Sequence, residues 1–203
     1  MRFDLFWSDA LACGYYPVDP ADWPYDAQYF AKYQTYAQSD LGKRISAFRA
    51  DLTEAHAKAG DIILDVGVGC GAFLLEMKTR RPRIWGYDVN PAAVEWLKGN
   101  GMFLAPDGRP DVMTFWDSFE HIPHPDKVIE HARHCVIMSI PIFWDAAHAR
   151  RSKHFRTDEH FWYFTTDGLV RFMRGCGFRL EQIEHAETRL GREDIETFVF
   201  KRV

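Results

Sequence analysis

Cysteine is scarce in this chain, and its spacing does not suit a metal or disulfide framework. The four cysteines are Cys13, Cys70, Cys135 and Cys176, and no two of them form a CxxC pair. This spacing argues against a cysteine zinc site and against a set of structural disulfides. A reducing compartment is the simpler setting, so we expect a cytoplasmic protein.

Long apolar runs and an excess of basic charge are also missing. No segment approaches the length of a membrane span, and Asp4 and Asp9 interrupt the start of the chain. We therefore expect neither a signal peptide nor a membrane partner. The formal net charge is -4 and the sequence pI is about 6.1, which disfavours a protein that binds nucleic acid through a broad basic face.

The chain has 203 residues, of which 47% are hydrophobic and 27% are charged, so it is long enough and apolar enough for a full core. We expect one domain over 1–203, with an aromatic N-terminal part over 1–59 and a core over 60–203. Gly14, Pro17, Pro20 and Pro24 predict an irregular arm over 1–24. A helix is expected over 26–38, and a second helix after Ser39.

Strands and helices then alternate, which predicts an α/β fold. Such alternation indicates a Rossmann-like, doubly wound sheet of about seven strands, mostly parallel. The last two strands are separated by a turn through Gly191 and predict an antiparallel C-terminal strand. The expected strands are 61–66, 83–89, a weak one at 102–104, 111–116, 135–140, 178–186 and 195–201. The expected helices of the core are 72–81, 91–98, 125–133 and 166–175.

A glycine-rich turn follows the first of these strands. Gly67, Gly69 and Gly71 stand between an apolar strand and a helix, where glycine lets the backbone turn tightly and approach a ligand. Asp88 comes 23 positions after Asp65, at the end of the next strand, where a carboxylate can accept hydrogen bonds from ribose hydroxyls. The two features together predict a nucleotide-like ligand, and glycines that serve packing alone are the alternative.

The identity of that ligand depends on the charge beside the turn. Gly67, Gly69 and Ala72 also satisfy the dinucleotide pattern GxGxxA. A dinucleotide, however, places an anionic pyrophosphate near Asp65, whereas S-adenosylmethionine has no phosphate and carries a cationic sulfonium. The acid therefore favours S-adenosylmethionine as cofactor. An NAD(P)-dependent oxidoreductase and a non-catalytic partner subunit that binds S-adenosylmethionine are the alternatives.

Four blocks in order resemble the class I S-adenosylmethionine-dependent methyltransferases, in particular the small-molecule and ubiquinone-biosynthesis group. They lie at 62–73, 84–97, 111–129 and 159–178. The resemblance implies a methyltransferase whose donor site comprises Asp65, Gly67, Gly69, Gly71, Asp88, Val89, Trp116 and Asp117. Asp88 would hold the ribose, and Val89 would pack on adenine. The segment 99–110 departs from the family pattern, since its one acid, Asp107, lies in a Pro-Asp-Gly turn.

Three side chains are candidates for the chemistry on the acceptor. His121 follows the fourth strand, at the end of the sheet where ligands bind, and His160 and Tyr163 belong to the segment that covers the acceptor pocket in similar enzymes. A carboxylate with imidazoles also suits a divalent ion, so Glu120, His121 and His160 are considered together as possible metal ligands. We expect hydrogen-bonded residues there and no metal.

Two further segments concern the acceptor itself. Arg150, Arg151, Lys153 and Arg156 form a basic run that predicts an anionic group on the acceptor, with a solvated surface as the alternative. The aromatic residues Trp23, Tyr29 and Tyr33 predict a lid over donor and acceptor, with packing across the sheet edge as the alternative. The acceptor expected from the sequence is a small molecule or a nucleotide.

Overall fold

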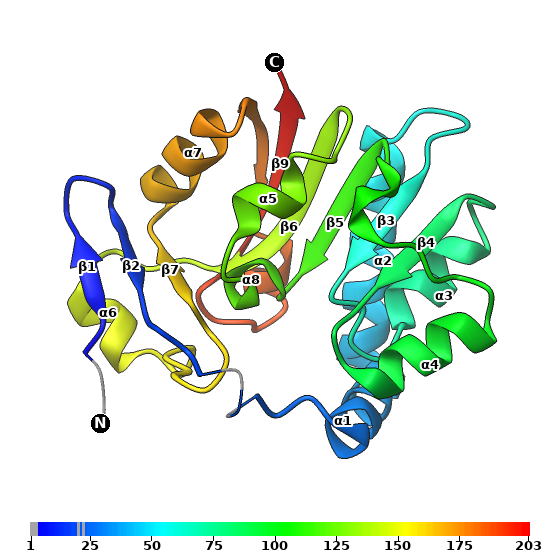
Figure 1. The fold of residues 1–203 in the computed structure, drawn as a ribbon, viewed down its shortest axis with the longest axis horizontal. Helices are drawn as coiled ribbons and strands as arrows, with labels where there is room; N and C mark the ends of the chain where they lie inside the picture. The colour runs from blue at the N-terminus through cyan, green and yellow to red at the C-terminus, as the bar shows by residue number, and fades with distance from the viewer. Residues whose placement is uncertain (1–3, 20, 22) are drawn as a thin grey trace.

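The main sheet of the computed structural model has six strands in the order β4-β3-β5-β6-β9-β8 (Figure 1). The structure describes residues 4–19, 21 and 23–203. The first four strands of this order are parallel to one another, as short crossover helices require. The strands are β3 (Ile63–Val66), β4 (Ile84–Tyr87), β5 (Val112–Trp116), β6 (Cys135–Pro141), β8 (Phe178–Glu184) and β9 (Ile195–Arg202).

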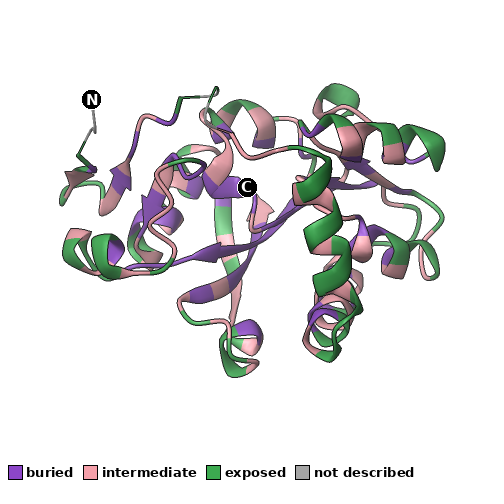
Figure 2. Cartoon of the chain, turned by 90° about the horizontal axis from the view of Figure 1, so that it is seen from below, coloured by how far each residue is buried: buried purple, intermediate pink, exposed green. Residues whose placement is uncertain are grey.

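Helices cover both faces of this sheet, so the predicted doubly wound α/β architecture is confirmed. On one face α2 (Asp40–His56), α3 (Ala72–Lys78) and α4 (Pro91–Gly99) pack on the strands, and on the other α5 (Pro125–Ile129) and α7 (Thr166–Gly175) do so. The central strands are buried on both faces, whereas the helices turn exposed residues outward (Figure 2). No helix in the described part of the chain is long and apolar enough to cross a membrane.

The C-terminal strand is antiparallel, as predicted. β9 lies between β6 and β8 and runs antiparallel to both. The connection from β8 to β9 is longer than a tight turn, since it contains the short helix α8 (Ala186–Arg189). The expected strand at 102–104 is reduced to a single bridge between Gly86 and Phe103, which is why the sheet has six strands instead of seven.

The N-terminal arm is more regular than the sequence predicted. β1 (Phe6–Ser8) and β2 (Cys13–Tyr15) form an antiparallel hairpin, and β2 pairs with β7 (Trp162–Phe164). The prediction of an irregular arm over 1–24 was wrong for this hairpin, because pairing with a distant strand stabilises segments too short to show a pattern. Pro20, part of that prediction, lies outside the described residues.

Both N-terminal helices form where they were expected. α1 (Ala27–Gln38) begins after Asp26, whose side chain accepts a hydrogen bond from the backbone of Tyr29. α2 begins after Ser39, whose hydroxyl accepts from Gly42. Such caps satisfy backbone donors that the first turn of a helix leaves free. α1 packs on α2 and so brings its tyrosines to the carboxyl ends of β3, β4 and β5.

Candidate functional site

A cavity of about 360 Å³ lies at the carboxyl ends of β3, β4 and β5 and is covered by α1 and α2. Ligands of doubly wound sheets bind at this edge. The glycine turn forms its floor. Gly67, Gly69 and Gly71 all have positive φ, and all of the turn from Gly67 to Cys70 lines the cavity. The predicted turn therefore exists in the left-handed conformations that favour glycine.

Gly67 is a turn glycine whose position leaves no room for a Cβ, so alanine there should be costly. Gly67 and Gly60 have φ of 80° and 84°, so either substitution incurs the left-handed penalty of about 1–2 kcal/mol. A Cβ on Gly67 would lie 2.4 Å from Ser118 Cβ, whereas nothing lies within 4 Å of one on Gly60. We expect Gly67→Ala to lose about 1–3 kcal/mol more than the matched control Gly60→Ala in urea unfolding. Equal losses would contradict the steric argument.

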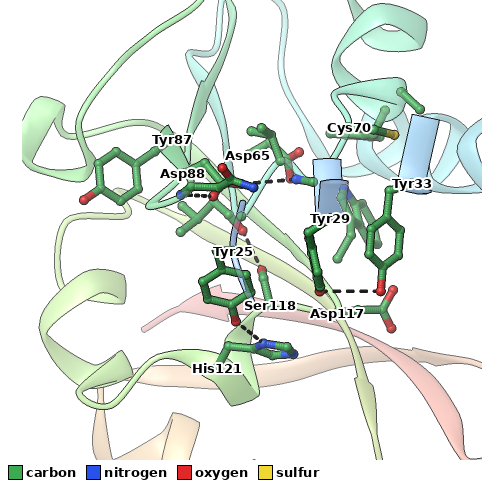
Figure 3. A pocket seen from close by; sticks show the side chains of 18 of the residues that line it. Tyr25, Tyr29, Tyr33, Asp65, Cys70, Tyr87, Asp88, Asp117, Ser118 and His121 are labelled. Atoms are coloured by element: carbon green, nitrogen blue, oxygen red, sulfur yellow. Dashed lines mark hydrogen bonds between the residues drawn. The ribbon is translucent and has the colours of Figure 1, made fainter. Parts of the chain in front are cut away.

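Asp88 stands at the end of β4 and faces the glycine turn (Figure 3). Its carboxylate accepts hydrogen bonds from the backbone N–H of Gly69, at 3.2 Å, and of Asn90, at 2.8 Å. Burial raises the pKa of this carboxyl. The next residue, Val89, is 53% exposed and lines the same cavity. The structure thus places an acid and an apolar surface side by side in the cavity lining.

Asp65 is buried in β3 directly beneath the turn. It is 1% exposed and accepts a hydrogen bond of 2.7 Å from the Thr114 hydroxyl. Burial raises the pKa of Asp65 to about 8. Asp65 is among the residues that line the cavity, where a cationic ligand would favour the ionised form of its carboxyl.

The raised pKa of Asp65 predicts a specific pH dependence of stability. Because the folded pKa of about 8 lies above the unfolded value near 3.9, this group contributes stability at low pH that is lost as the pH rises from about 4 to 8. Asp65→Asn keeps an acceptor for Thr114 and removes the titration. Relative to this variant, we expect the wild type to lose up to ~1.4 kcal/mol of unfolding free energy per pH unit between about pH 5 and pH 7. If the unfolding free energies of the wild type and of Asp65→Asn, measured in urea at several pH values, change with pH in parallel, the pKa of Asp65 is not raised.

Trp116 and Asp117 end β5 and both line the cavity. The indole N–H of Trp116 is buried and has no hydrogen-bond partner among the described residues. Asp117, which has φ of 57°, is instead occupied by two guanidinium groups, those of Arg49 and Arg192, at 2.7 and 2.9 Å. Although burial opposes ionisation, the charges of these arginines hold the pKa of Asp117 well below its usual range.

The two arginines also share a second acid that sequence reasoning missed. Glu187 in α8 is fully buried, and it accepts hydrogen bonds from Arg49 at 2.7 Å, from the Ser139 hydroxyl at 2.7 Å, and from Arg192. Arg49 could have been noticed, because it lies on the apolar stripe of α2 between Ile45 and Leu52. No spacing in the sequence indicates that Glu187 reaches it.

The other half of the cavity is aromatic. It is lined from the N-terminal segment by five rings, those of Trp23, Tyr25, Tyr29, Tyr33 and Tyr36. Tyr25 packs edge-on against Tyr29, and Tyr29 lies 4.8 Å from Tyr33 between ring centres. The tyrosines predicted to form a lid therefore do lie over the cavity, facing the donor turn (Figure 3).

Of the three catalytic candidates, only His121 lines the cavity. Its Nδ1 lies 2.6 Å from the Tyr25 hydroxyl, and its ring lies 4.5 Å from that of His160. Burial lowers the pKa of His121 to about 3 and lowers that of His160 as well, so both imidazoles are neutral. Tyr163 is fully buried behind His160 against Phe143, outside the cavity lining.

The basic run lies outside the cavity lining as well. Arg150 donates to the backbone oxygen of Leu5, Lys153 pairs with Glu193, and Arg156 pairs with Glu159. An anionic acceptor group that contacts this run stays a prediction. Asp107, the acid of the departing segment 99–110, lies in a 3₁₀ turn at Pro106–Gly108 and also does not line the cavity.

Comparison with known proteins agrees with this geometry. A family model described as a methyltransferase domain matches residues 30–183. The chain belongs to this family, and the expected class, the class I S-adenosylmethionine-dependent methyltransferases, is confirmed. No curated protein matches the sequence.

Solved structures share the fold at low sequence identity. A chain from the complex of the Haloferax volcanii Trm112 methyltransferase activator with a methyltransferase has a TM-score of 0.64 and 13% identity, covering 92% of this chain and 99% of that one. The magnesium protoporphyrin IX methyltransferase of Synechocystis PCC 6803 with bound SAH has a TM-score of 0.63 and 12% identity, over 87% and 95%. The [4+2]-cyclase SpnF has a TM-score of 0.57 and 13% identity, over 82% and 83%.

Proposed function

We propose that the protein transfers a methyl group from S-adenosylmethionine to a small aromatic acceptor bound beneath the tyrosines of α1. The observation that carries the donor half is the glycine turn with Asp88 hydrogen-bonded to it in the cavity lining. The fit is supported by open space above Gly69, by the exposed Val89 surface and by the unpartnered indole N–H of Trp116. The known SAH complex of a structurally similar methyltransferase supports the same ligand class.

The acceptor class follows from the opposite wall. The clustered tyrosines and Trp23 offer apolar ring surfaces with hydroxyl groups at their edges, which suit a planar ring that carries a few polar substituents. Arg156 is paired with Glu159, and Glu159 also accepts a hydrogen bond from Tyr29 at 3.2 Å. The charge of Arg156 is therefore compensated beside this wall.

The chain's own residues would act mainly by alignment. When bound, S-adenosylmethionine supplies an electrophilic methyl group for in-line displacement. The glycine turn and Asp88 would fix the donor, the tyrosines would hold the acceptor ring on the opposite side, and α1 and α2 would exclude water from between them. Holding two reactants in line in this way can supply much of the acceleration of such a step.

Calorimetric titration with S-adenosylmethionine and with NADH tests the donor. Micromolar binding of the sulfonium compound alone supports the proposal, whereas preference for NADH would favour the oxidoreductase alternative. The structural similarity to a cyclase shows that this fold also houses other chemistry, so turnover has to be measured as well. Methylation of aromatic hydroxyl or amine compounds from labelled donor supports an enzyme, and donor binding without turnover across that panel would favour the partner-subunit alternative.

A further inference from the structure

Asn90 is a buried polar residue of the cavity lining whose side chain reaches the start of helix α1. It lies between β4 and α4, two positions after Asp88, and only 4% of it is exposed. Both Asn90 and Asp88 line the cavity. The donor site that the sequence predicted does not include Asn90, which sequence alone shows as the residue before a helix that begins with proline.

Three hydrogen bonds fix Asn90 in one orientation. Its backbone N–H donates to the Asp88 carboxylate at 2.8 Å, and its side-chain oxygen accepts from the backbone N–H of Ala92 at 3.0 Å. Its side-chain Nδ2 donates to the backbone oxygen of Asp26 at 3.0 Å, 64 positions away in the chain. These partners also define which amide atom is which, because an N–H needs an acceptor and a carbonyl needs a donor.

Asp26 is the residue at which α1 begins. Its side chain accepts a hydrogen bond of 2.8 Å from the backbone N–H of Tyr29, and its backbone oxygen accepts from Phe30 at 3.1 Å as well as from Asn90. Groups that fix the capping residue fix the first turn of the helix. None of the residues described in α1 is buried, so the position of this helix depends on a small number of such contacts.

The first turn of α1 matters because it carries part of the acceptor wall, the side of the cavity formed by aromatic rings. Tyr25 precedes the capping residue, and Tyr29 and Tyr33 belong to the helix itself. The bond from Asn90 therefore joins this wall to the turn that holds Asp88.

We propose that Asn90 is a positioning residue that couples the donor site to α1, so that a ligand bound at Asp88 stabilises α1 over the cavity. A ribose hydroxyl bound to Asp88 would restrict this carboxylate, and the bond to the N–H of Asn90 would pass the restriction to the amide that holds Asp26. Coupling between two sites is reciprocal, so a fixed α1 strengthens donor binding by the same factor. The coupling rests on the donor half of the proposed function and does not depend on which acceptor is used.

Hydrogen–deuterium exchange of α1 in the full chain, with and without S-adenosylhomocysteine, tests this coupling. In the wild type we expect the ligand to slow exchange of α1 by about 5-fold, the factor that one hydrogen bond of ordinary strength supplies. Asn90→Ser keeps a capping oxygen for α4 but lacks the amide donor, so its α1 should exchange faster and show no slowing by the ligand. Its affinity for S-adenosylhomocysteine, from calorimetric titration, should fall by no more than the same factor of about 5.

The matched control is Asn100→Ser. The Asn100 amide donates to the backbone oxygen of Trp96 at 2.8 Å at the exposed end of α4, outside the cavity lining, so the slowing of α1 by the ligand should persist. Asn90→Asp keeps both the size of the side chain and a capping oxygen, and it should lose the slowing as Asn90→Ser does.

Every other outcome overturns the coupling. It is refuted if the wild type binds S-adenosylhomocysteine without slower exchange of α1, if either Asn90 variant retains the slowing, or if Asn100→Ser loses it. In the first two cases donor binding itself still stands, and with it the donor half of the proposed function. A wild type that does not bind S-adenosylhomocysteine refutes the donor half and the coupling together.

Discussion

Replacing Asp88 with alanine will weaken the binding of S-adenosylmethionine by about 100-fold while the protein stays folded. A carboxylate that accepts hydrogen bonds from ribose hydroxyls contributes about 1.5–3 kcal/mol for each charged bond, and a loss near 3 kcal/mol corresponds to this factor. The substitution also removes the acceptor that fixes the N–H groups of Gly69 and Asn90, so the turn itself loses order. Calorimetric titration gives the affinity directly.

Two variants separate these contributions. Asp88→Asn keeps one oxygen for the backbone bonds but removes the charge, so it should lie between wild type and alanine. Asp107→Ala removes an acid that does not line the cavity and should bind the donor as the wild type does. If Asp107→Ala loses affinity as strongly as Asp88→Ala, the ribose would have to be assigned to a different acid.

The largest effect on stability is expected at Glu187. Its carboxylate is fully buried and carries bonds from Arg49, Arg192 and Ser139, which tie α2 and α8 to the ends of β5 and β6. Glu187→Ala would leave two largely buried guanidinium groups to share Asp117 alone. Breaking a buried ion pair by removing one partner typically destabilises by 3–5 kcal/mol, so we expect a loss of about this size in urea unfolding at neutral pH.

The contrast with an exposed ion pair makes this prediction specific. Glu181 pairs with Arg179 at 2.6 Å, but both side chains are exposed, at 37% and 59%. Exposed pairs contribute about 0–1 kcal/mol, so Glu181→Ala should change little. Similar losses for the two variants would mean that the buried network does not stabilise the fold beyond an ordinary surface contact.

The donor half of the site was predictable because its residues are close in sequence. Gly67, Gly69, Gly71 and Asp88 belong to two consecutive strand–turn–helix units, and the spacing of their residue types shows which sheet edge they share. The charge network was not predictable, since Arg49 and Glu187 are 138 positions apart and meet only in the folded structure, where α8 lies against α2. A lone arginine on an apolar helix stripe indicates that a partner exists without identifying it.

The N-terminal hairpin and the contacts that build the acceptor wall could not be predicted for a related reason. β1 and β2 have three residues each, too few to show alternation, and they depend on β7 for pairing. In the same way, the bond between Tyr25 and His121 joins segments 96 positions apart. Local patterns therefore predicted the elements and the turn, whereas contacts between distant segments decide how the acceptor side is built.

The position of β9 inside the sheet has a consequence for biosynthesis. Until residues 195–202 have left the ribosome, β6 presents an open edge and β8 has no neighbour to join. An unpaired edge of apolar residues invites pairing with other chains. The nascent protein thus passes through a stage at which most of its core strands have been synthesised but the edge of β6 is still unpaired. A premature stop just before Ile195 would make that aggregation-prone stage permanent.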